Sequence, residues 1–234
     1  MHKIIRKALG KLNIAIALTL AVVMTGGLGG VIYVLASSTS NFTQTINPGS
    51  LAVDIVDASY VTVGSPTMAM SAATFSFTCQ TITGSFGTTS QQIYVKNPDA
   101  ADSGWVVSLA AQAAANIWDS VGPDFDFNDP TGTGCTDGAD AGDTVGGQMT
   151  VDPSGATMAT STCASCVTTD ITKGSSAAFN EGVTNTITIL TGAAASNDIG
   201  DWTLQGVSIS QKIQAEQPAA SDYDINMVLT IAAT

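Results

Sequence analysis

An acidic stretch, PDFDFNDPTGTGCTDGADAGD from Pro123 to Asp143, carries the residue types that could bind a metal ion. It holds six carboxylates and one Asn amide, and it contains no Lys, Arg or His. Ca²⁺ takes oxygen ligands of this kind, and extracellular modules use weak calcium sites. The candidate ligands for Ca²⁺ are Asp124, Asp126, Asn128, Asp129, Asp137, Asp140 and Asp143.

The spacing within this acidic stretch is not that of an EF-hand. A loop that began at Asp124 would need Gly at its sixth position and a carboxylate at its twelfth. Asp129 and Cys135 occupy these positions instead. The alternation also allows Phe125 and Phe127 to point inward from a strand while the acidic residues face water. The sequence therefore leaves two interpretations open, a calcium site of another type and a solvated surface loop.

The four cysteines, Cys79, Cys135, Cys163 and Cys166, suggest a second chemistry. Cys163 and Cys166 form a CxxC motif, which occurs in zinc sites and in redox proteins. A zinc site of four cysteines would need two such pairs, and a redox motif needs a helix N-terminus or a cation to make its thiols reactive. Only one pair is present, in a Thr-rich segment with only Lys173 nearby. In an extracellular protein we therefore expect two structural disulfides.

Four cysteines allow three pairings, and the sequence does not choose between them. We expect Cys135 to bond with Cys163 or Cys166, and the other member of the CxxC motif to bond with Cys79.

The first 36 residues have the composition of a secretion signal or a membrane anchor. Four basic residues precede an apolar run, residues 13–36, which ends in Val34-Leu35-Ala36 before a polar stretch. This order matches a signal peptide that is cleaved after Ala36. At 1.5 Å per residue the run would reach about 34 Å, so it could also anchor an uncleaved chain in a bilayer. In both interpretations the rest of the chain lies outside the cell. If the chain is uncleaved, residues 13–36 are its only expected contact with a membrane.

The charge balance beyond residue 36 excludes several functions. This part keeps three lysines, Lys96, Lys173 and Lys212, against nineteen acidic residues, a net charge of −16, and it has no Arg or His. Without His, a Ser-His-Asp triad or a Cys-His pair cannot form. The negative charge opposes binding to nucleic acids and to anionic lipids. Carboxylate pairs are available for glycosidase chemistry, but Gly-rich loops hold them poorly. We expect a protein that is not an enzyme.

The chain after residue 50 predicts an all-β domain. Runs rich in β-branched and aromatic residues alternate with Gly, Asn, Asp, Ser and Pro, as in antiparallel strands joined by turns and loops. The Ala-rich residues 108–120 leave a short helix open. The predicted strands span residues 51–57, 74–82, 92–96, 104–111, 184–190, 203–213 and 223–231. We expect an antiparallel, immunoglobulin-like β-sandwich over residues 51–234.

Residues 119–180 differ in composition from the rest of this domain. Gly, Ser, Thr, Asp and Ala dominate, three of the four cysteines lie here, and few large apolar residues are present. We interpret this stretch as an acidic insertion that is ordered by disulfides rather than by a core. Residues 37–50, which precede the sandwich, are interpreted as a linker or a donor segment.

Trp105 and Trp202 each begin an expected strand, after Gly104 and Asp201 respectively. An exposed indole at such a position would be a surface for binding glycans or the cell wall. A buried indole would fill the core at the end of a sheet, which is the commoner use of Trp in a small sandwich. The sequence leaves both interpretations open.

Three segments, residues 90–112, 186–210 and 214–234, resemble in order and character the WxL-type domains of Gram-positive cell surfaces. Gly104-Trp105-Val106-Val107 stands where that family has Gly-Trp-x-Leu. Trp202-Thr203-Leu204 is a true W-x-L, although it precedes the closing strands, and the terminal MVLTIAAT has no Trp. The resemblance covers residues 74–232, apart from the insertion. It implies an extracellular β-sandwich that uses its Trp motifs to associate with peptidoglycan, beside other surface proteins.

These observations predict a non-enzymatic protein of the bacterial cell envelope, secreted or displayed on the surface, that associates with peptidoglycan or with other surface proteins. The alternative is a self-associating subunit of a filament or matrix. In that case residues 37–50 would donate a β-strand to the sheet edge of a neighbour. Ca²⁺ bound in the acidic stretch is the only cofactor expected, and no nucleic acid is expected as a partner.

Overall fold

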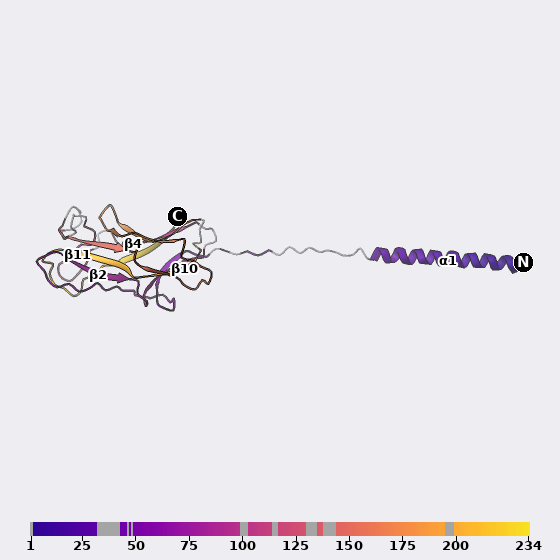
Figure 1. Ribbon diagram of the computed structural model, residues 1–234, viewed down its shortest axis with the longest axis horizontal. Helices are drawn as coiled ribbons and strands as arrows, with labels where there is room; N and C mark the ends of the chain where they lie inside the picture. The colour runs from indigo at the N-terminus through magenta and orange to yellow at the C-terminus, as the bar shows by residue number, and fades with distance from the viewer. Residues whose placement is uncertain are drawn as a thin grey trace. The chain divides into compact units, whose positions relative to one another are not determined.

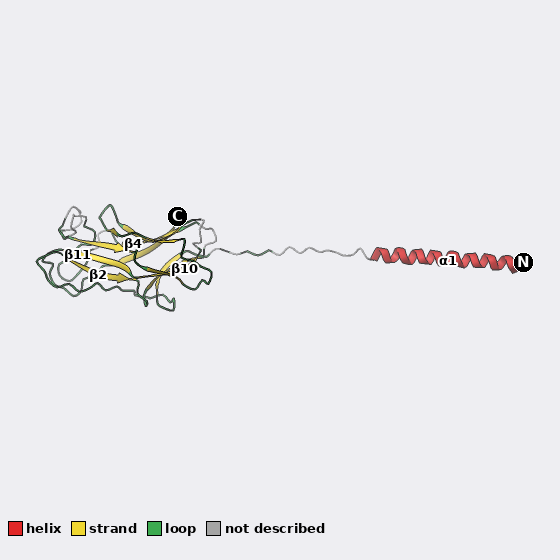
Figure 2. Ribbon diagram, in the orientation of Figure 1, coloured by secondary structure: helices red, strands yellow, loops and turns green. Residues whose placement is uncertain are grey.

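The computed structural model describes residues 2–31, 43–45, 47, 49–98, 103–113, 117–129, 135–137, 144–194 and 199–234. The chain divides into two compact units, Met1–Ile46 and Asn47–Thr234. Figures 1 and 2 trace the helix of the first unit and the strands of the second.

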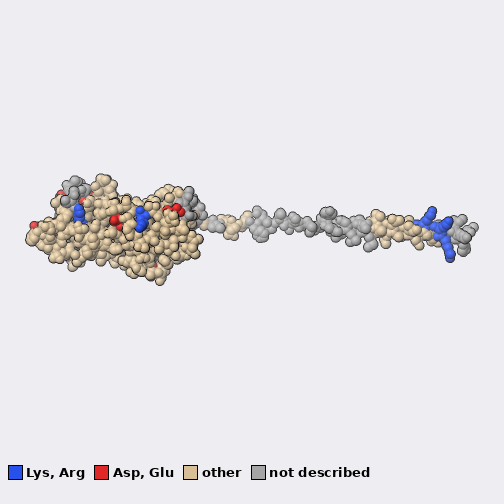
Figure 3. Space-filling model, viewed as in Figure 1, with Lys and Arg blue, Asp and Glu red and all other residues tan. Residues whose placement is uncertain are grey.

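The first unit contains one helix, α1, which spans His2–Val31. Its cationic side chains Arg6, Lys7 and Lys11 lie toward its N-terminal end (Figure 3). Apolar side chains such as Leu18 and Val22 are more than 60% exposed, so the surface of the helix is largely apolar after residue 11. Within the described part of α1, no stretch combines the length and the hydropathy that a membrane-crossing helix needs.

The second unit is built from β-strands, and its described residues contain no helix (Figure 2). Every strand pair is antiparallel, and the strands form three four-stranded sheets. The sheet orders are β1-β3-β10-β6, β2-β11-β5-β8 and β12-β4-β9-β7. The strands are β1 (Ala52–Val56), β2 (Gln80–Phe86), β3 (Gln92–Asn97), β4 (Trp105–Ala111), β5 (Gly147–Asp152), β6 (Thr157–Thr160), β7 (Ile171–Lys173), β8 (Ala177–Ala178), β9 (Thr186–Gly192), β10 (Gly200–Gln205), β11 (Val207–Ile213) and β12 (Met227–Ala233).

The first two sheets follow each other along shared stretches of chain. Only Gly206, with a φ of +80°, separates β10 from β11, and residues 87–91 separate β2 from β3. β10 pairs with β3 while β11 pairs with β2, and Gly206 N donates to the carbonyl oxygen of Gly87 at 2.7 Å where the two pairs meet. β6 and β5 continue the same arrangement on the other side of β10 and β11.

All three sheets contribute side chains to one core. Alternate residues of β4 and β11 are buried, as expected for strands with one face on the interior. β10 is the exception, because four consecutive residues, Asp201–Leu204, are buried. The burial of Asp201 is due in part to the loop with the CxxC motif, which hydrogen-bonds to its carboxylate.

The prediction of an all-β, antiparallel fold is confirmed, with corrections to individual segments. The predicted strand over residues 74–82 is wrong in its first six residues, since β2 begins at Gln80. Phe75 and Phe77 are 49% and 76% exposed. The short helix left open within residues 108–120 is absent from the described part of that range, where β4 runs to Ala111.

The expectation that residues 119–180 are ordered by disulfides rather than by a core is wrong. This range supplies β5, β6, β7 and β8, which extend all three sheets. Phe125, Phe127 and Phe179 from this range are buried in the common core, and the rings of the last two meet edge to face at 5.2 Å. β5–β8 are short and rich in Gly, Thr and Ala. The few large apolar residues of residues 119–180 therefore carry the packing, but they give no regular alternation in the sequence.

Candidate functional site

The CxxC motif lies in a loop that folds back over the outer face of β10. We name residues 161–168 the CASC loop. β6 ends at Thr160, which is paired with Trp202, and the next residue, Ser161, extends the pairing by donating its N–H to the carbonyl oxygen of Asp201 at 3.1 Å. The chain then turns, and Cys163 and Cys166 form a disulfide.

Asp201 holds this loop in place. Its side chain is 4% exposed, and it accepts hydrogen bonds from three residues on two segments. Oδ1 accepts the N–H of Cys163 at 2.8 Å. Oδ2 accepts the hydroxyl of Tyr94 at 2.9 Å, the N–H of Thr162 at 3.2 Å and the hydroxyl of Thr162. The carboxylate thus joins β3, β10 and the CASC loop.

Burial and hydrogen bonds shift the pKa values of Asp201 and Tyr94 in opposite directions. Burial by itself would raise the pKa of Asp201, but the hydrogen bonds from Thr162, Cys163 and Tyr94 outweigh it and hold that pKa below the ordinary value of a carboxyl. Burial, together with the hydrogen bond to Asp201 and the charge of that carboxylate, raises the pKa of Tyr94 to about 12. At neutral pH the site therefore contains a carboxylate and a neutral phenol.

The two residues that flank Asp201 fit the loop to the core. Trp202 Nε1 donates to the carbonyl oxygen of Val167 at 2.8 Å, and its ring packs on Trp105 with centroids 5.6 Å apart. A Cβ at Gly200 would lie 2.1 Å from Cys166 Sγ, so only Gly lets the sulfur approach the strand this closely. The disulfide, the carboxylate and the tryptophan pair form one continuous arrangement.

The chemistry of this arrangement depends on the state of its sulfurs. Cys163 Sγ, Cys166 Sγ and a carboxylate oxygen of Asp201 all lie within 4.8 Å of one another. As a disulfide, the two sulfurs provide neither a thiolate nucleophile nor a metal ligand. In this form the CASC loop covers the outer face of β10 and serves stability.

The expected disulfide pairing is wrong, although all four cysteines are in disulfides. Cys79 bonds to Cys135, and Cys163 bonds to Cys166. The reason is the pairing of β2 and β5 with β11, which aligns Gln80 and Gly147 with the same residue, Ile213. Cys79 and Cys135 meet at this end of the sheet, whereas the CASC loop lies over a different one.

The interpretation of Trp105 and Trp202 as surface-binding residues is also wrong. Both side chains are 0% exposed and belong to the core. Their rings come from β4 and β10, strands of different sheets that face each other across the interior. Neither indole has a face that a glycan could contact.

The acidic stretch is partly buried rather than wholly solvated. Asp126, Asn128 and Asp129 are buried beside Phe125 and Phe127. Oδ1 of Asp126 accepts the N–H groups of Phe127 at 2.6 Å and Asn128 at 3.2 Å. With its amide nitrogen facing Asp126, Asn128 also donates to both carboxylate oxygens, at 2.9 and 3.0 Å. The interpretation as a solvated surface loop required all the acidic side chains to face water, and the buried Asp126 and Asp129 do not.

The other candidate calcium ligands are placed differently. Asp124 is half-buried and accepts the N–H of Ser120 at 3.0 Å. Asp137 is exposed, and Asp140 and Asp143 lie outside the described residues. The structure therefore buries three of the seven candidates, Asp126, Asn128 and Asp129, and joins the first two by hydrogen bonds.

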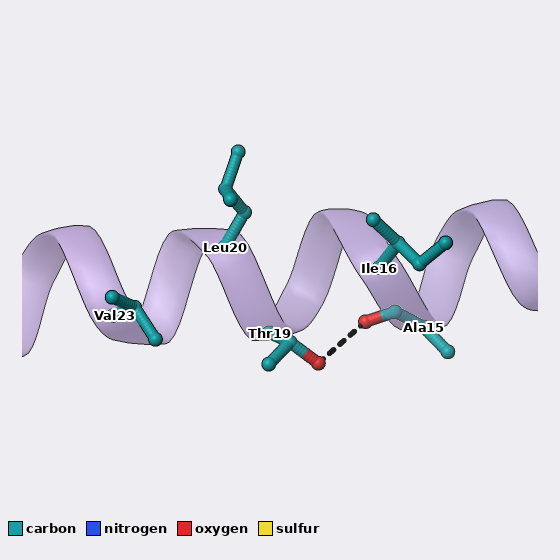
Figure 4. Close-up of a pocket in the computed structure, with 5 residues that line it drawn as sticks. All are labelled: Ala15, Ile16, Thr19, Leu20 and Val23. Carbon is teal, nitrogen blue, oxygen red and sulfur yellow. Dashed lines mark hydrogen bonds between the residues drawn. The ribbon is translucent and has the colours of Figure 1, made fainter.

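α1 presents a shallow apolar surface formed by Ala15, Ile16, Thr19, Leu20 and Val23 (Figure 4). The Thr19 hydroxyl donates to the carbonyl oxygen of Ala15 at 2.8 Å, so it is satisfied within the helix. All five residues come from one helix and none is charged. This surface has no group that could act on a substrate.

Asp201, Tyr94 and Thr162 were not predicted as site residues. In the sequence, Asp201 is marked only by its position before Trp202, and Tyr94 and Thr162 belong to ordinary β-type sequence. No protein-family model, curated protein or solved structure matches the chain, and its function is therefore inferred from its own residues.

Proposed function

We propose that the protein is a non-enzymatic structural protein of the bacterial cell surface that self-associates by β-strand addition. Two disulfides are typical of proteins that function in an oxidising, extracellular environment. The observation that carries the proposal is the partly exposed apolar side of the second unit, Asn47–Thr234, where the edge strands β1 and β12 lie.

β1 and β12 are edge strands of different sheets and contact each other without pairing. Met227, Leu229 and Ile231 on β12 are only half-buried, and so is Val53 on β1, whereas Ile55 and Val56 of β1 are buried. The corresponding side chains of the central strands β4 and β10 are almost wholly buried. An added strand along β12 would cover this apolar surface and satisfy the unpaired backbone groups of the edge.

The strand is supplied by residues 37–50 in this proposal. The described residues of this segment are exposed. Gly49 N donates to the carbonyl oxygen of Pro98 at 3.3 Å, which continues the pairing of β1 with β3. A segment that already continues β1 would have to reverse within a few residues to pair with the open edge of its own unit. The partner is therefore a second copy of the chain.

The lengths are compatible with this exchange. β12 has seven residues, and an extended partner for all of them spans about 23 Å at 3.3 Å per residue. The fourteen residues from 37 to 50 span up to about 46 Å when extended, which leaves room for a connection between copies. A contact in which each copy donates to the next is heterologous, so it repeats and produces filaments rather than closed dimers.

Two finer features belong to this proposal. The three sheets share one core, which supports an immunoglobulin-like sandwich whose open side is the β1 and β12 side. The resemblance to WxL-type domains predicts association with peptidoglycan through tryptophans. Because Trp105 and Trp202 are buried, self-association is favoured over wall binding through these residues.

Calcium binding in the acidic stretch is also part of this proposal. Asp126 and Asp129 place two buried carboxylates three residues apart, with the amide of Asn128 between them in sequence, and buried carboxylates require hydrogen bonds or cations to compensate their charge. Weak calcium binding here would stabilise the fold without acting in assembly. We expect Ca²⁺ to raise the melting temperature relative to chelator, and Asp129→Asn to abolish the difference. An unchanged melting temperature in chelator would contradict the calcium site.

The test of self-association starts from the chain without residues 1–36, as cleavage would leave it. It is sedimented alone and with peptidoglycan sacculi, and the pellets are inspected by electron microscopy. We expect filaments in the absence of sacculi. Deletion of residues 37–50 should abolish them, and so should Val228→Lys, which places a charge on β12 at a side chain that is already 39% exposed. Val183→Lys, at a 78% exposed residue in the turn before β9, is the matched control.

Mixing the two defective chains distinguishes strand donation from other contacts. The deletion variant keeps an intact β12, and Val228→Lys keeps an intact donor segment. We therefore expect a one-to-one mixture to form dimers that neither chain forms alone. Filaments that persist after the deletion would refute strand donation, and pelleting only in the presence of sacculi would establish wall binding instead.

A further inference from the structure

We propose that the CASC loop and Asp201, once the Cys163–Cys166 disulfide is reduced, form a binding site for a zinc-like divalent cation. The ligand atoms are the two Sγ atoms and one carboxylate oxygen of Asp201, which lie within 4.8 Å of one another. This site is independent of self-association at β12, since it lies over β10.

The backbone holds the three ligands near one another without help from the disulfide. Cys163 is fixed to Asp201 by its N–H hydrogen bond at 2.8 Å, and Cys166 N donates to the carbonyl oxygen of Cys163 at 3.4 Å. The far end of the loop is tied to the core by the 2.8 Å hydrogen bond from Trp202 Nε1 to Val167. Opening the S–S bond therefore leaves both ends of the CASC loop attached to β10.

The electrostatics favour a cation over redox catalysis. A buried carboxylate beside a thiol disfavours the thiolate, which is the form that attacks disulfides and other electrophiles. A divalent cation reverses this balance, because it brings positive charge to two thiolates and one carboxylate at the same point.

The ligand set matches the preferences of zinc. Zn²⁺ binds Cys sulfur and Asp oxygen in tetrahedral geometry, and three protein ligands leave the fourth position to water. Cys163 and Cys166 are half-buried rather than enclosed, so a hydrated cation can reach them. The Tyr94 hydroxyl donates to Asp201 Oδ2 at 2.9 Å, which orients Asp201 in the way that outer hydrogen bonds orient metal ligands.

The chemical steps balance with a small thiol as reductant. Two thiol molecules supply two electrons and two protons to the disulfide, which becomes two cysteine thiols, and the reductant leaves as its own disulfide. The cation then displaces the two thiol protons, which pass to solvent, and it binds the two thiolates together with the carboxylate. In the reverse step the disulfide of the same small thiol accepts the two electrons from the cysteine thiolates and two protons from solvent, which re-forms the Cys163–Cys166 bond, yields two thiol molecules and releases the cation.

The experiment uses the full chain with Cys79→Ser and Cys135→Ser, so that the CASC loop carries the only cysteines. The reduced and oxidised forms are titrated with Co²⁺, and binding is followed by thiolate-to-cobalt charge-transfer absorption. We expect one Co²⁺ per chain in the reduced form, displaced by Zn²⁺, and none in the oxidised form. Absence of the charge-transfer band in the reduced chain, or an equal band after the further changes Cys163→Ser and Cys166→Ser, would overturn the proposal.

The role of Asp201 is tested separately. In the same background Asp201→Asn should weaken Co²⁺ binding at least tenfold, whereas Asp152→Asn, a carboxylate on β5 that bonds to the nearby Ser154, should leave it unchanged. Near-ultraviolet circular dichroism of the oxidised form shows whether each variant folds. If Asp201→Asn does not fold, X-ray absorption of the parent chain decides. Two sulfur ligands with oxygen support the site, and a shell of oxygen alone rejects it.

Discussion

Replacing Gly200 by Ala tests the close fit between β10 and the CASC loop. The added Cβ would lie 2.1 Å from Cys166 Sγ, and 3.2 Å from both Cys166 Cβ and Trp202 Cζ2, whereas ordinary contacts begin at 3.4 Å. Gly200 also has a φ of +154°, which residues with a side chain rarely adopt. The disulfide and the tryptophan pair on either side cannot move without breaking contacts of their own.

The expected loss of stability has two parts. Forcing an extra methyl group into a packed site costs about 1–3 kcal/mol. Holding a non-glycine residue in a sparsely populated backbone region costs about 1–3 kcal/mol more. A combined loss near the middle of this range, about 4 kcal/mol, is a large share of the stability of a typical domain. For a domain of this size it corresponds to a fall in melting temperature of about 8–16 °C.

The assay is urea denaturation followed by tryptophan fluorescence, with two matched glycines as controls. Gly182 has a φ of +69° and open space around its Cβ position, so Gly182→Ala measures the cost of the backbone conformation alone. Gly155 has open space and no positive φ, so Gly155→Ala should be nearly neutral. We expect the order of losses to be Gly200, then Gly182, then Gly155.

A double-mutant cycle then identifies the atom responsible. In a chain with Cys163→Ala and Cys166→Ala the sulfur is absent, and Gly200→Ala should lose at least half of its effect. The reasoning is refuted if Gly200→Ala costs no more than Gly182→Ala, or if its cost is the same with and without the sulfur.

Three further predictions concern the disulfides and the buried hydrogen bonds. Removing the Cys79–Cys135 disulfide, with a sequence separation of 56, should lower the free energy of unfolding in urea by about 4 kcal/mol. Removing the disulfide of the CASC loop, with a separation of 3, should lower it by about 2 kcal/mol. Equal losses would contradict the loop-closure model. The folded-state pKa of Asp201 is lowered, so its stabilisation is present above the unfolded value of 3.8 and is lost as pH falls through the folded pKa. Asp201→Asn should therefore flatten the loss of stability in acid, and an unchanged acid profile would argue against this role. The pKa of Tyr94 is raised from 10.0 to about 12, so its stabilisation is present below pH 10.0 and is lost as pH rises toward 12. Absorbance titration should show one tyrosine that ionises near 12, and its persistence in Tyr94→Phe would contradict the assignment.

The strands that the sequence predicted well are those with large apolar residues at alternate positions. β3, β4, β11 and β12 are of this kind: the first three have a face buried in the core, and β12 packs half-buried side chains against it. β5–β8 were missed because they are short and contain mostly Gly, Thr and Ala. Met149 and Val151 are the buried apolar pair of β5, and two such residues do not establish a period.

The candidate site was visible only in part. The CxxC motif is a local feature and can be read from four consecutive residues. Asp201 lies 39 residues from Thr162 and 107 from Tyr94, and no local pattern relates them. The pairing of β10 with β3 on one side and β6 on the other brings the three together.

By itself, the sequence determined the all-β class and the chemistry that the chain cannot perform. Residue composition and alternation are local properties, and the lack of His and Arg beyond residue 36 holds whatever the fold. Only the tertiary structure decided which cysteines bond, that Trp105 and Trp202 are buried, and that the Asp201 carboxylate lies under a disulfide loop. These are relations between residues far apart in the chain, and they follow from which strands become neighbours when the sheets pair and share a core.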